Sequence, residues 1–344
     1  MKEFINKVVD GEDLTEDEAE GAMKTIMSGG ATQAQIGAFL AALRMKGENV
    51  AEITAFARVM REFASSIHPK VKGTLVDTCG TGGDKMKTFN ISTLAAFVVA
   101  GADVPIAKHG NRSVTSKSGS ADVLEALGMK LDMTPADVEK SIEEIGIGFM
   151  FAPAFHKAMK HAIGPRKEIG IRTVFNILGP LTNPADAKAQ VMGVYDSELT
   201  EKMANVLKNL GIERCMVVHG LEGMDEMSTV SKTQVSELRD NEVISYVLKP
   251  EDLGLKRAST TDLVGWDAAY NAGIAMEVMR DKAKGPKRDV VVLNAAAGIY
   301  VGGMADNMEE AIEIANASID SGKAFEKLET LIKRSGGRLG SLGA

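Results

Sequence analysis

VDTCGTGGDKMKTFNIST, residues 76–93, is a glycine- and hydroxyl-rich loop that runs into the apolar helical segment LAAFVVAGA. A second loop of the same kind, AKHGNRSVTSKSGSAD at residues 107–122, runs into the helical pattern VLEALG. Residues 104–107 between them are an apolar run of strand length. Unpaired backbone N–H groups and the helix dipole favour anions at such helix starts. The two loops therefore predict a site for a ligand with more than one phosphate group.

The composition is that of an ordinary globular protein. Its 344 residues are 44% hydrophobic and 25% charged, which predicts two or three domains with a sizeable core. A formal net charge of −7 argues against a nucleic-acid binder. Cys79 and Cys215 form no CxxC pattern, which argues against a disulfide framework or zinc site and fits a reducing cytoplasm. The sequence shows neither a signal-peptide core nor a membrane-length apolar run, so we expect a cytoplasmic protein without a membrane partner.

The first part of the chain, to about residue 70, has the pattern of a small all-α unit. Apolar residues recur there at helical spacing, and no strand pattern is present. Each predicted helix start carries a capping box: Thr15 with Glu18, Thr32 with Gln35, and Asn49 with Glu52.

From residue 73 onward, short apolar runs alternate with helical stretches such as 198–210 and 266–280. The candidate strands are residues 74–77, 104–107, 190–194, 214–219 and 289–293. This alternation predicts an α/β unit with a mostly parallel central sheet covered by helices. Residues 138–183 have a more helical pattern and could return to the first unit. We therefore expect a discontinuous helical domain, residues 1–70 plus about 157–184, and an α/β donor-binding domain, residues 71–156 plus 185–344.

GTGGD, at residues 80–84, matches neither the P-loop nor the GxGxxG pattern. A plain tight turn remains an alternative for this loop alone. The polar side chains of Asn90, Ser92 and Thr93 follow at the start of the next helix, where ordinary N-capping needs only one of them. The combination favours a phosphate or diphosphate contact.

KHGNR, at residues 108–112, places cationic and amide side chains at a strand end, where α/β proteins bind ligands. Lys108 suits a point-charge contact to phosphate. Gly119 permits a close backbone approach, and Ser118 or Ser120 could cap the following helix.

Acidic and cationic residues elsewhere could complete this site. Asp225 and Glu226 could be exposed surface acids, but carboxylates beside a polyphosphate site are suitable Mg²⁺ ligands, with the Ser92 hydroxyl as a further candidate. Arg166 could bind a substrate carboxylate through its guanidinium fork. His156 lies beside apolar neighbours, where a lone histidine is more often a satisfied core residue than a catalyst.

The elements DTCGTGGD, NIST, KHGNR, SGSADVLEALG, NILGPLTNP and DE occur in the order of the anthranilate phosphoribosyltransferase family. The chain resembles that family over nearly its whole length. The resemblance implies transfer of the phosphoribosyl group of 5-phosphoribosyl 1-diphosphate to anthranilate, the second step of tryptophan biosynthesis from anthranilate. The products would be N-(5-phosphoribosyl)anthranilate and diphosphate, and two Mg²⁺ ions would be required.

The resemblance also assigns roles to individual residues. It implies donor contacts at Gly80, Gly83, Asp84, Thr88, Asn90, Ile91, Ser92, Thr93, Lys108, His109, Gly110, Asn111, Arg112, Ser113, Val114, Thr115, Ser116 and Ser120. It implies anthranilate contacts at Gly80, Asn111 and Arg166. The implied magnesium ligands are Ser92, Asp225 and Glu226, and the implied catalytic residues are Lys108, Asp225 and Glu226.

The chain departs from the family pattern in two places. It has Arg166-Lys167 where many members have an Arg-Arg pair, which leaves open which cation binds the carboxylate. Its HGLEGMDE segment is longer than the HGEGLDE of many members.

Two other functions remain alternatives: a pyrimidine nucleoside phosphorylase-like enzyme and a non-enzymatic nucleic-acid-binding paralogue. The acidic pair and the negative net charge count against the second. Family resemblance further implies a homodimer formed through the helical unit. We expect any anthranilate synthase partner to be a separate chain.

Overall fold

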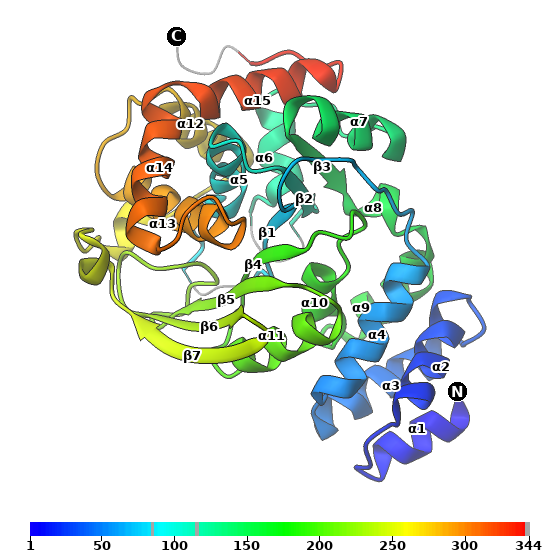
Figure 1. The fold of residues 1–344 in the computed structure, drawn as a ribbon. Helices are drawn as coiled ribbons and strands as arrows, with labels where there is room; N and C mark the ends of the chain where they lie inside the picture. The colour runs from blue at the N-terminus through cyan, green and yellow to red at the C-terminus, as the bar shows by residue number, and fades with distance from the viewer. Residues whose placement is uncertain (84–85, 114–116, 341–344) are drawn as a thin grey trace.

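The computed structural model describes residues 1–83, 86–113 and 117–340. A smaller group of helices at the N-terminal end lies beside a larger sheet wrapped by helices (Figure 1). The first group begins with α1 (Lys2–Val9), α2 (Glu16–Met27), α3 (Gln33–Lys46) and α4 (Val50–Glu62). All three predicted capping boxes are present at the starts of α2, α3 and α4. The prediction of an all-α N-terminal unit is confirmed.

A later part of the chain returns to these helices. Helix α9 (Lys160–Ile169) packs against α2 and α3, and α10 (Phe175–Leu178) packs against α4. Ala162 and Phe175 belong to the same buried apolar cluster as Phe39 and Phe56. This packing supports a helical domain that is discontinuous in sequence, and its predicted boundaries stay a prediction.

The strands of the described residues form one seven-stranded sheet in the order β3-β2-β1-β4-β5-β6-β7. The strands β1 to β5 run parallel, and β6 and β7 form an antiparallel edge. Their bounds are β1 (Val76–Gly80), β2 (Ile106–Gly110), β3 (Ile147–Phe151), β4 (Ala189–Gly193), β5 (Arg214–Gly220), β6 (Thr233–Arg239) and β7 (Glu242–Leu248). The predicted fold class, α/β with a mostly parallel sheet, is confirmed.

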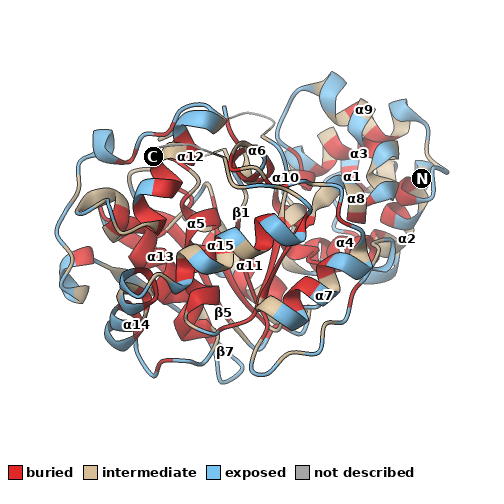
Figure 2. Cartoon of the chain, turned by 90° about the horizontal axis from the view of Figure 1, so that it is seen from above, coloured by how far each residue is buried: buried red, intermediate tan, exposed pale blue. Residues whose placement is uncertain are grey.

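Helices cover this sheet and bury its apolar faces. They are α5 (Ile91–Gly101), α6 (Ser120–Ala126), α7 (Pro135–Ile145), α8 (Ala152–Phe155), α11 (Leu199–Asn209), α12 (Ala268–Met279), α13 (Pro286–Val301), α14 (Met308–Asp320) and α15 (Lys323–Arg334). Short 3₁₀ turns occur at Lys157–Met159, Gly179–Leu181, Pro250–Leu253 and Thr260–Leu263. Figure 2 shows the buried residues concentrated in the sheet and in α5 and α13.

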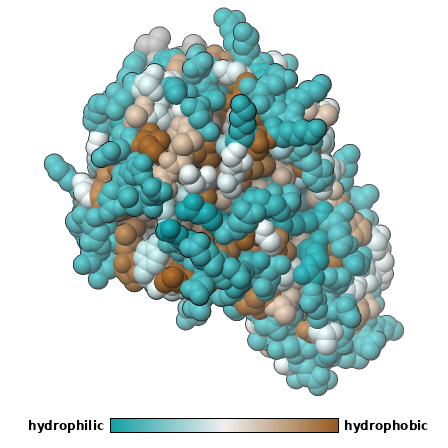
Figure 3. Space-filling view, in the orientation of Figure 1, coloured by the Kyte–Doolittle hydropathy of each residue, from teal (hydrophilic) through white to brown (hydrophobic). Residues whose placement is uncertain are grey.

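Hydrophilic side chains cover most of the molecular face drawn in Figure 3, including the N-terminal helices. In the described part of the chain, every helix is too short or too polar to cross a membrane.

One strand prediction is wrong and three strands were not predicted. Residues 289–293 lie inside α13, which is buried on nearly all sides between α5, α14 and the sheet. A short apolar run has the same pattern in a buried helix as in a buried strand, and this explains the error. The missed strands are β3, inside a region expected to be helical, and the antiparallel pair β6 and β7. The predicted starts of β1 and β2 were two residues early.

Candidate active site

The carboxyl ends of β1, β2, β4 and β5 lie along one edge of the sheet. The first ligand loop, residues 81–90, follows β1, and the second, residues 111–119, follows β2. The segment with Asp225 and Glu226 follows β5. Ligands of open parallel sheets bind at this edge, so the elements that the sequence singled out are brought together.

The acidic pair is in contact with the first ligand loop and with the start of α5. The Gly82 backbone N–H donates to Asp225 Oδ2 at 2.8 Å, and the Ser92 N–H donates to Glu226 Oε1 at 3.1 Å. A Cβ atom on Gly80 would lie 2.8 Å from Asp225 Oδ2. The two carboxylates therefore lie within the candidate site. The alternative that they are exposed surface acids is wrong.

The electrostatics of the pair favour a bound cation. Burial, and then the neighbouring Asp225 charge, raise the pKa of Glu226 to about 8, while Lys108 acts in the opposite direction. A divalent ion would neutralise the two acids. Mg²⁺ in proteins uses one or two carboxylates together with phosphate oxygens and water. No group of three or more His, Cys, Asp or Glu side chains among the described residues could hold a metal by itself. The residues present therefore fit a magnesium that is also held by the substrate.

Lys108 lies at the floor of the site. Its side chain is only 3% exposed, and its Nζ donates to the Thr78 carbonyl oxygen at 2.5 Å. Burial lowers the pKa of Lys108, and the charges of Asp77, Cys79 and Glu226 oppose that shift. The Lys108 side chain therefore reaches from β2 to the neighbouring strand β1, and its charge interacts with that of Glu226.

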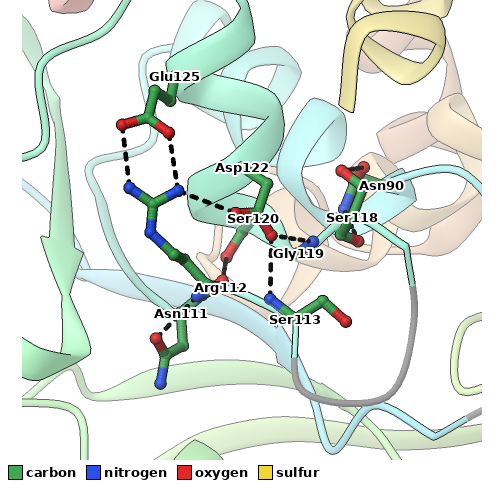
Figure 4. Close-up of polar contacts among 9 residues, drawn as sticks. All are labelled: Asn90, Asn111, Arg112, Ser113, Ser118, Gly119, Ser120, Asp122 and Glu125. Carbon is green, nitrogen blue, oxygen red and sulfur yellow. Dashed lines mark hydrogen bonds and ion pairs between the residues drawn. The ribbon is translucent and has the colours of Figure 1, made fainter. Parts of the chain in front are cut away.

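A network of backbone and carboxylate contacts holds the second ligand loop (Figure 4). Arg112 donates through both terminal nitrogens to Glu125, at 2.7 and 2.9 Å, and also contacts Asp122. Its guanidinium is therefore occupied in this structure, and its predicted substrate contact stays a prediction. The Asp122 carboxylate also accepts from the backbone N–H groups of Ser113 and Gly119.

The predicted cap of α6 is wrong. The N-cap residue is Gly119, and neither Ser118 nor Ser120 caps the helix through its side chain. Ser120 Oγ instead donates to the Asn111 carbonyl oxygen. The close approach predicted at Gly119 is confirmed, since a Cβ there would lie 2.6 Å from the Asn111 oxygen.

Fewer polar side chains are accessible at the start of α5 than the sequence predicts. Ile91 and Thr93 are buried, so Ser92 is the half-buried hydroxyl of this turn. Asn90 is the N-cap residue but makes no side-chain capping bond. Its Nδ2 donates to the Ser118 carbonyl oxygen at 3.1 Å, which joins the two ligand loops.

The candidate acceptor cation lies on α9. Burial lowers the pKa of Arg166, whose guanidinium stacks over the Phe175 ring at 5.0 Å from its centroid. Within the described residues Arg166 has no carboxylate partner. The neighbouring Lys167 is exposed. This difference favours Arg166 as the binder of a substrate carboxylate.

Comparisons with known proteins show which family has this sequence and fold. Residues 72–325 match the α/β domain of a glycosyl transferase family, and residues 2–64 match that family's helical bundle domain. The chain is 58% identical to anthranilate phosphoribosyltransferase of Acetivibrio thermocellus, covering 97% of this chain and 96% of that one. It is also 58% identical to the enzyme of Methanocorpusculum labreanum, covering 98% and 99%. The chain belongs to the anthranilate phosphoribosyltransferase family.

Solved structures of this family have the same fold. The Thermus thermophilus enzyme matches with a TM-score of 0.92 at 42% identity, covering 96% of this chain and 99% of that one. The Saccharomyces cerevisiae enzyme, solved in complex with PRPP and Mg, matches with a TM-score of 0.89 at 28% identity and 97% coverage of both chains.

The structure places two buried histidines together, a relationship that the sequence did not reveal. The rings of His109 and His156 lie 5.0 Å apart between centroids, beneath the second ligand loop. Burial lowers the pKa of His109 to about 3 and that of His156 to about 4, so both rings are neutral at pH 7. The elements α6, α7, β3 and α8 lie between the two histidines in sequence, and no spacing rule connects them.

Arg172 is a second residue whose position the sequence did not predict. Its Nη2 donates to the Gly83 carbonyl oxygen at 2.8 Å, and its guanidinium stacks over Tyr195. It therefore connects the segment after α9 to the first ligand loop. Of the family's expected donor contacts, Asp84, Val114, Thr115 and Ser116 lie outside the described residues.

Proposed function

We propose that this chain transfers the phosphoribosyl group of 5-phosphoribosyl 1-diphosphate to the amine of anthranilate. The observation that supports the proposal most strongly is the contact of the two acids with neighbouring backbone N–H groups: Asp225 accepts from Gly82 of the first ligand loop, and Glu226 accepts from Ser92 at the start of α5. Carboxylates suited to magnesium beside the start of α5, a proposed anion-binding helix start, support this proposal. Membership of the family supports the same reaction.

In this proposal the acidic pair and Ser92 hold Mg²⁺, with two ions in the complete site. The metal would neutralise diphosphate charge as it develops. The backbone N–H groups of the two loops and the buried Lys108 ammonium orient the diphosphate and stabilise its charge. The bond between ribose C1 and the diphosphate oxygen breaks, and diphosphate leaves with the electron pair.

The acceptor half of the reaction needs positioning more than proton transfer. An aromatic amine is neutral at pH 7, so its lone pair can attack C1 from the face opposite diphosphate without a strong base. The C1–N bond forms and the amine then loses a proton to water. Arg166 would hold the anthranilate carboxylate, and Asn111 and Gly80 would lie near the ring.

We infer that the enzyme acts in the cytoplasm as a homodimer, with any anthranilate synthase partner on a separate chain. The remaining residues named from the family resemblance are proposed donor contacts. Sedimentation of the purified chain would test the dimer.

The activity is tested by incubating the purified chain with Mg²⁺, the diphosphate donor and anthranilate, and following loss of anthranilate fluorescence. We expect consumption that stops when the donor is omitted. A chain that instead split pyrimidine nucleosides with inorganic phosphate, and left anthranilate unchanged, would replace this proposal with the phosphorylase alternative. Salt-sensitive DNA retention without either reaction would support the non-enzymatic alternative.

A further inference from the structure

A third segment, residues 263–271, lies against the first ligand loop. The Phe89 N–H donates to the Leu263 carbonyl oxygen at 3.2 Å, and the Gly265 N–H donates to the Lys87 carbonyl oxygen at 2.9 Å. An antiparallel bridge between Thr88 and Val264 lies between these bonds. We call residues 263–271 the docking segment. It pairs with the loop as a short strand would.

The docking segment approaches the loop so closely that Gly265 has no space for a side chain. A Cβ atom there would lie 2.7 Å from both the N and the Cα of Phe89, and 2.9 Å from Asn271 Oδ1. These contacts fix the distance between the loop backbone and the start of α12.

Asn271, the last residue of the docking segment and part of α12, makes the contact with Asn90. Its side chain is 2% exposed, its Oδ1 accepts from the Trp266 N–H at 2.9 Å, and its Nδ2 donates to Asn90 Oδ1 at 3.0 Å. Asn90 Nδ2 in turn donates to the Ser118 carbonyl oxygen. A chain of amides therefore runs from α12 through the first ligand loop to the second.

The second ligand loop also contacts the docking segment directly. Lys117 Nζ lies over the ring of Trp266, 2.7 Å from its centroid. Trp266 is 56% exposed and is the only tryptophan of the sequence. Both ligand loops therefore contact the docking segment, which no sequence motif had indicated.

We propose that Asn271 is a positioning residue for the diphosphate donor: it orients the Asn90 amide and so sets the spacing of the two ligand loops. Because Asn271 Oδ1 is already bound to the Trp266 N–H, its Nδ2 faces Asn90 as a fixed donor. Asn90 must then present its oxygen to Asn271 and its Nδ2 to Ser118. The inference rests on the proposed function, since it takes the two loops to be the donor site.

The test replaces Asn271 with Asp, which keeps the shape and the acceptor, removes the donor N–H facing Asn90 and adds a negative charge, and with Ala, which removes the same N–H without adding charge. The inference requires the same direction of change in both variants. We expect the KM for the diphosphate donor to rise about tenfold, the size expected for losing one buried hydrogen bond. Asn90 Oδ1 would keep only its 3.4 Å contact with the Ser118 hydroxyl. The KM for anthranilate should stay within about twofold. Tyr270→Phe, at the half-exposed neighbouring position of α12, is the matched control and should leave both constants unchanged.

A double-mutant cycle shows whether Asn271 acts through Asn90. If it does, Asn90→Ala with Asn271→Ala should raise the donor KM no more than Asn90→Ala alone. If the double variant raised the donor KM by the product of the two separate effects, the inference would be overturned. It would also be overturned if the KM values for both substrates rose equally.

Trp266 fluorescence provides a readout that does not depend on turnover. Donor titration of the wild-type chain should change the emission of Trp266, and Asn271→Asp should shift that titration to about tenfold higher donor concentration. A midpoint unchanged in Asn271→Asp would overturn the inference. A wild-type chain that bound the donor but consumed no anthranilate would overturn the proposed function instead, and the titration would still test the role of Asn271.

Discussion

Asp225 Oδ2 accepts a 2.8 Å hydrogen bond from the backbone N–H of Gly82, a residue 143 positions away in the sequence. This bond joins the segment after β5 to the glycine loop after β1. The Asp225 carboxylate therefore lies where these two elements meet, beside the carboxyl ends of β1 and β4.

Gly80→Ala should strongly reduce the activity of the enzyme without unfolding it. The new Cβ would lie 2.8 Å from Asp225 Oδ2, so the carboxylate must move. Small displacements of this kind cost about a hundredfold in rate, and we expect that loss in kcat/KM for the donor. Gly273→Ala is the control, because a Cβ there has no neighbour within 4 Å. Equal activity of the two variants would contradict the tight contact.

Neutralising both acids, Asp225→Asn with Glu226→Gln, should lower turnover more than it weakens anthranilate binding. The amides keep the size of the side chains but lose the charge that attracts magnesium. We expect kcat to fall about a hundredfold or more, as for other losses of transition-state charge stabilisation. Steady-state kinetics across a magnesium titration would measure this. An unchanged kcat at saturating magnesium would exclude the pair as metal ligands.

Arg166→Ala should mainly raise the KM for anthranilate. The half-buried guanidinium over Phe175 would lose a charge-assisted contact to the carboxylate, which is worth about 1.5–3 kcal/mol, or about tenfold or more in KM. Lys167→Ala removes a cation from the adjacent exposed position and should leave that KM unchanged. If Lys167→Ala gave the larger effect, the carboxylate contact would belong to Lys167.

The buried histidines should make the fold sensitive to mild acid. Their folded pKa values, about 3 for His109 and about 4 for His156, lie below the ordinary value near 6.5. As the pH falls below 6.5 the unfolded chain binds protons that the native state excludes, so stability is lost. Each ring contributes a slope of up to about 1.4 kcal/mol per pH unit between pH 6.5 and 5.

Urea unfolding at several pH values would measure this slope. His156→Phe should lower the slope of the unfolding free energy against pH by the contribution of one histidine ring. His68→Asn, at an exposed position, should keep the wild-type slope. An identical slope in His156→Phe and the wild-type chain would contradict burial of that ring.

The sequence predicted the elements whose signal is local. Capping at Thr15, Thr32 and Asn49 depends on residues three positions apart, and all three boxes formed. The glycine loops could likewise be read from their own residues. Residues 289–293 were wrongly predicted to be a strand. Because α13 is buried on nearly all sides, it lacks the periodicity that distinguishes a helix from a strand.

The contacts that complete the site depend on the tertiary fold and carried no local signal. Asn271 lies 181 residues from Asn90, and nothing in its neighbourhood distinguishes it from any helical asparagine. The pairing of Arg112 with Glu125 was missed for another reason: a basic residue in a ligand loop was expected to face the ligand.

The central claim is that the two ligand loops and the acidic pair form one site for the diphosphate donor and its metal. A crystal structure of the chain soaked with the donor, Mg²⁺ and anthranilate tests it most directly. The account predicts diphosphate between the loops, with metal about 2.1 Å from carboxylate oxygens of Asp225 and Glu226. Diphosphate bound away from both loops, or metal bound without either carboxylate, would contradict it.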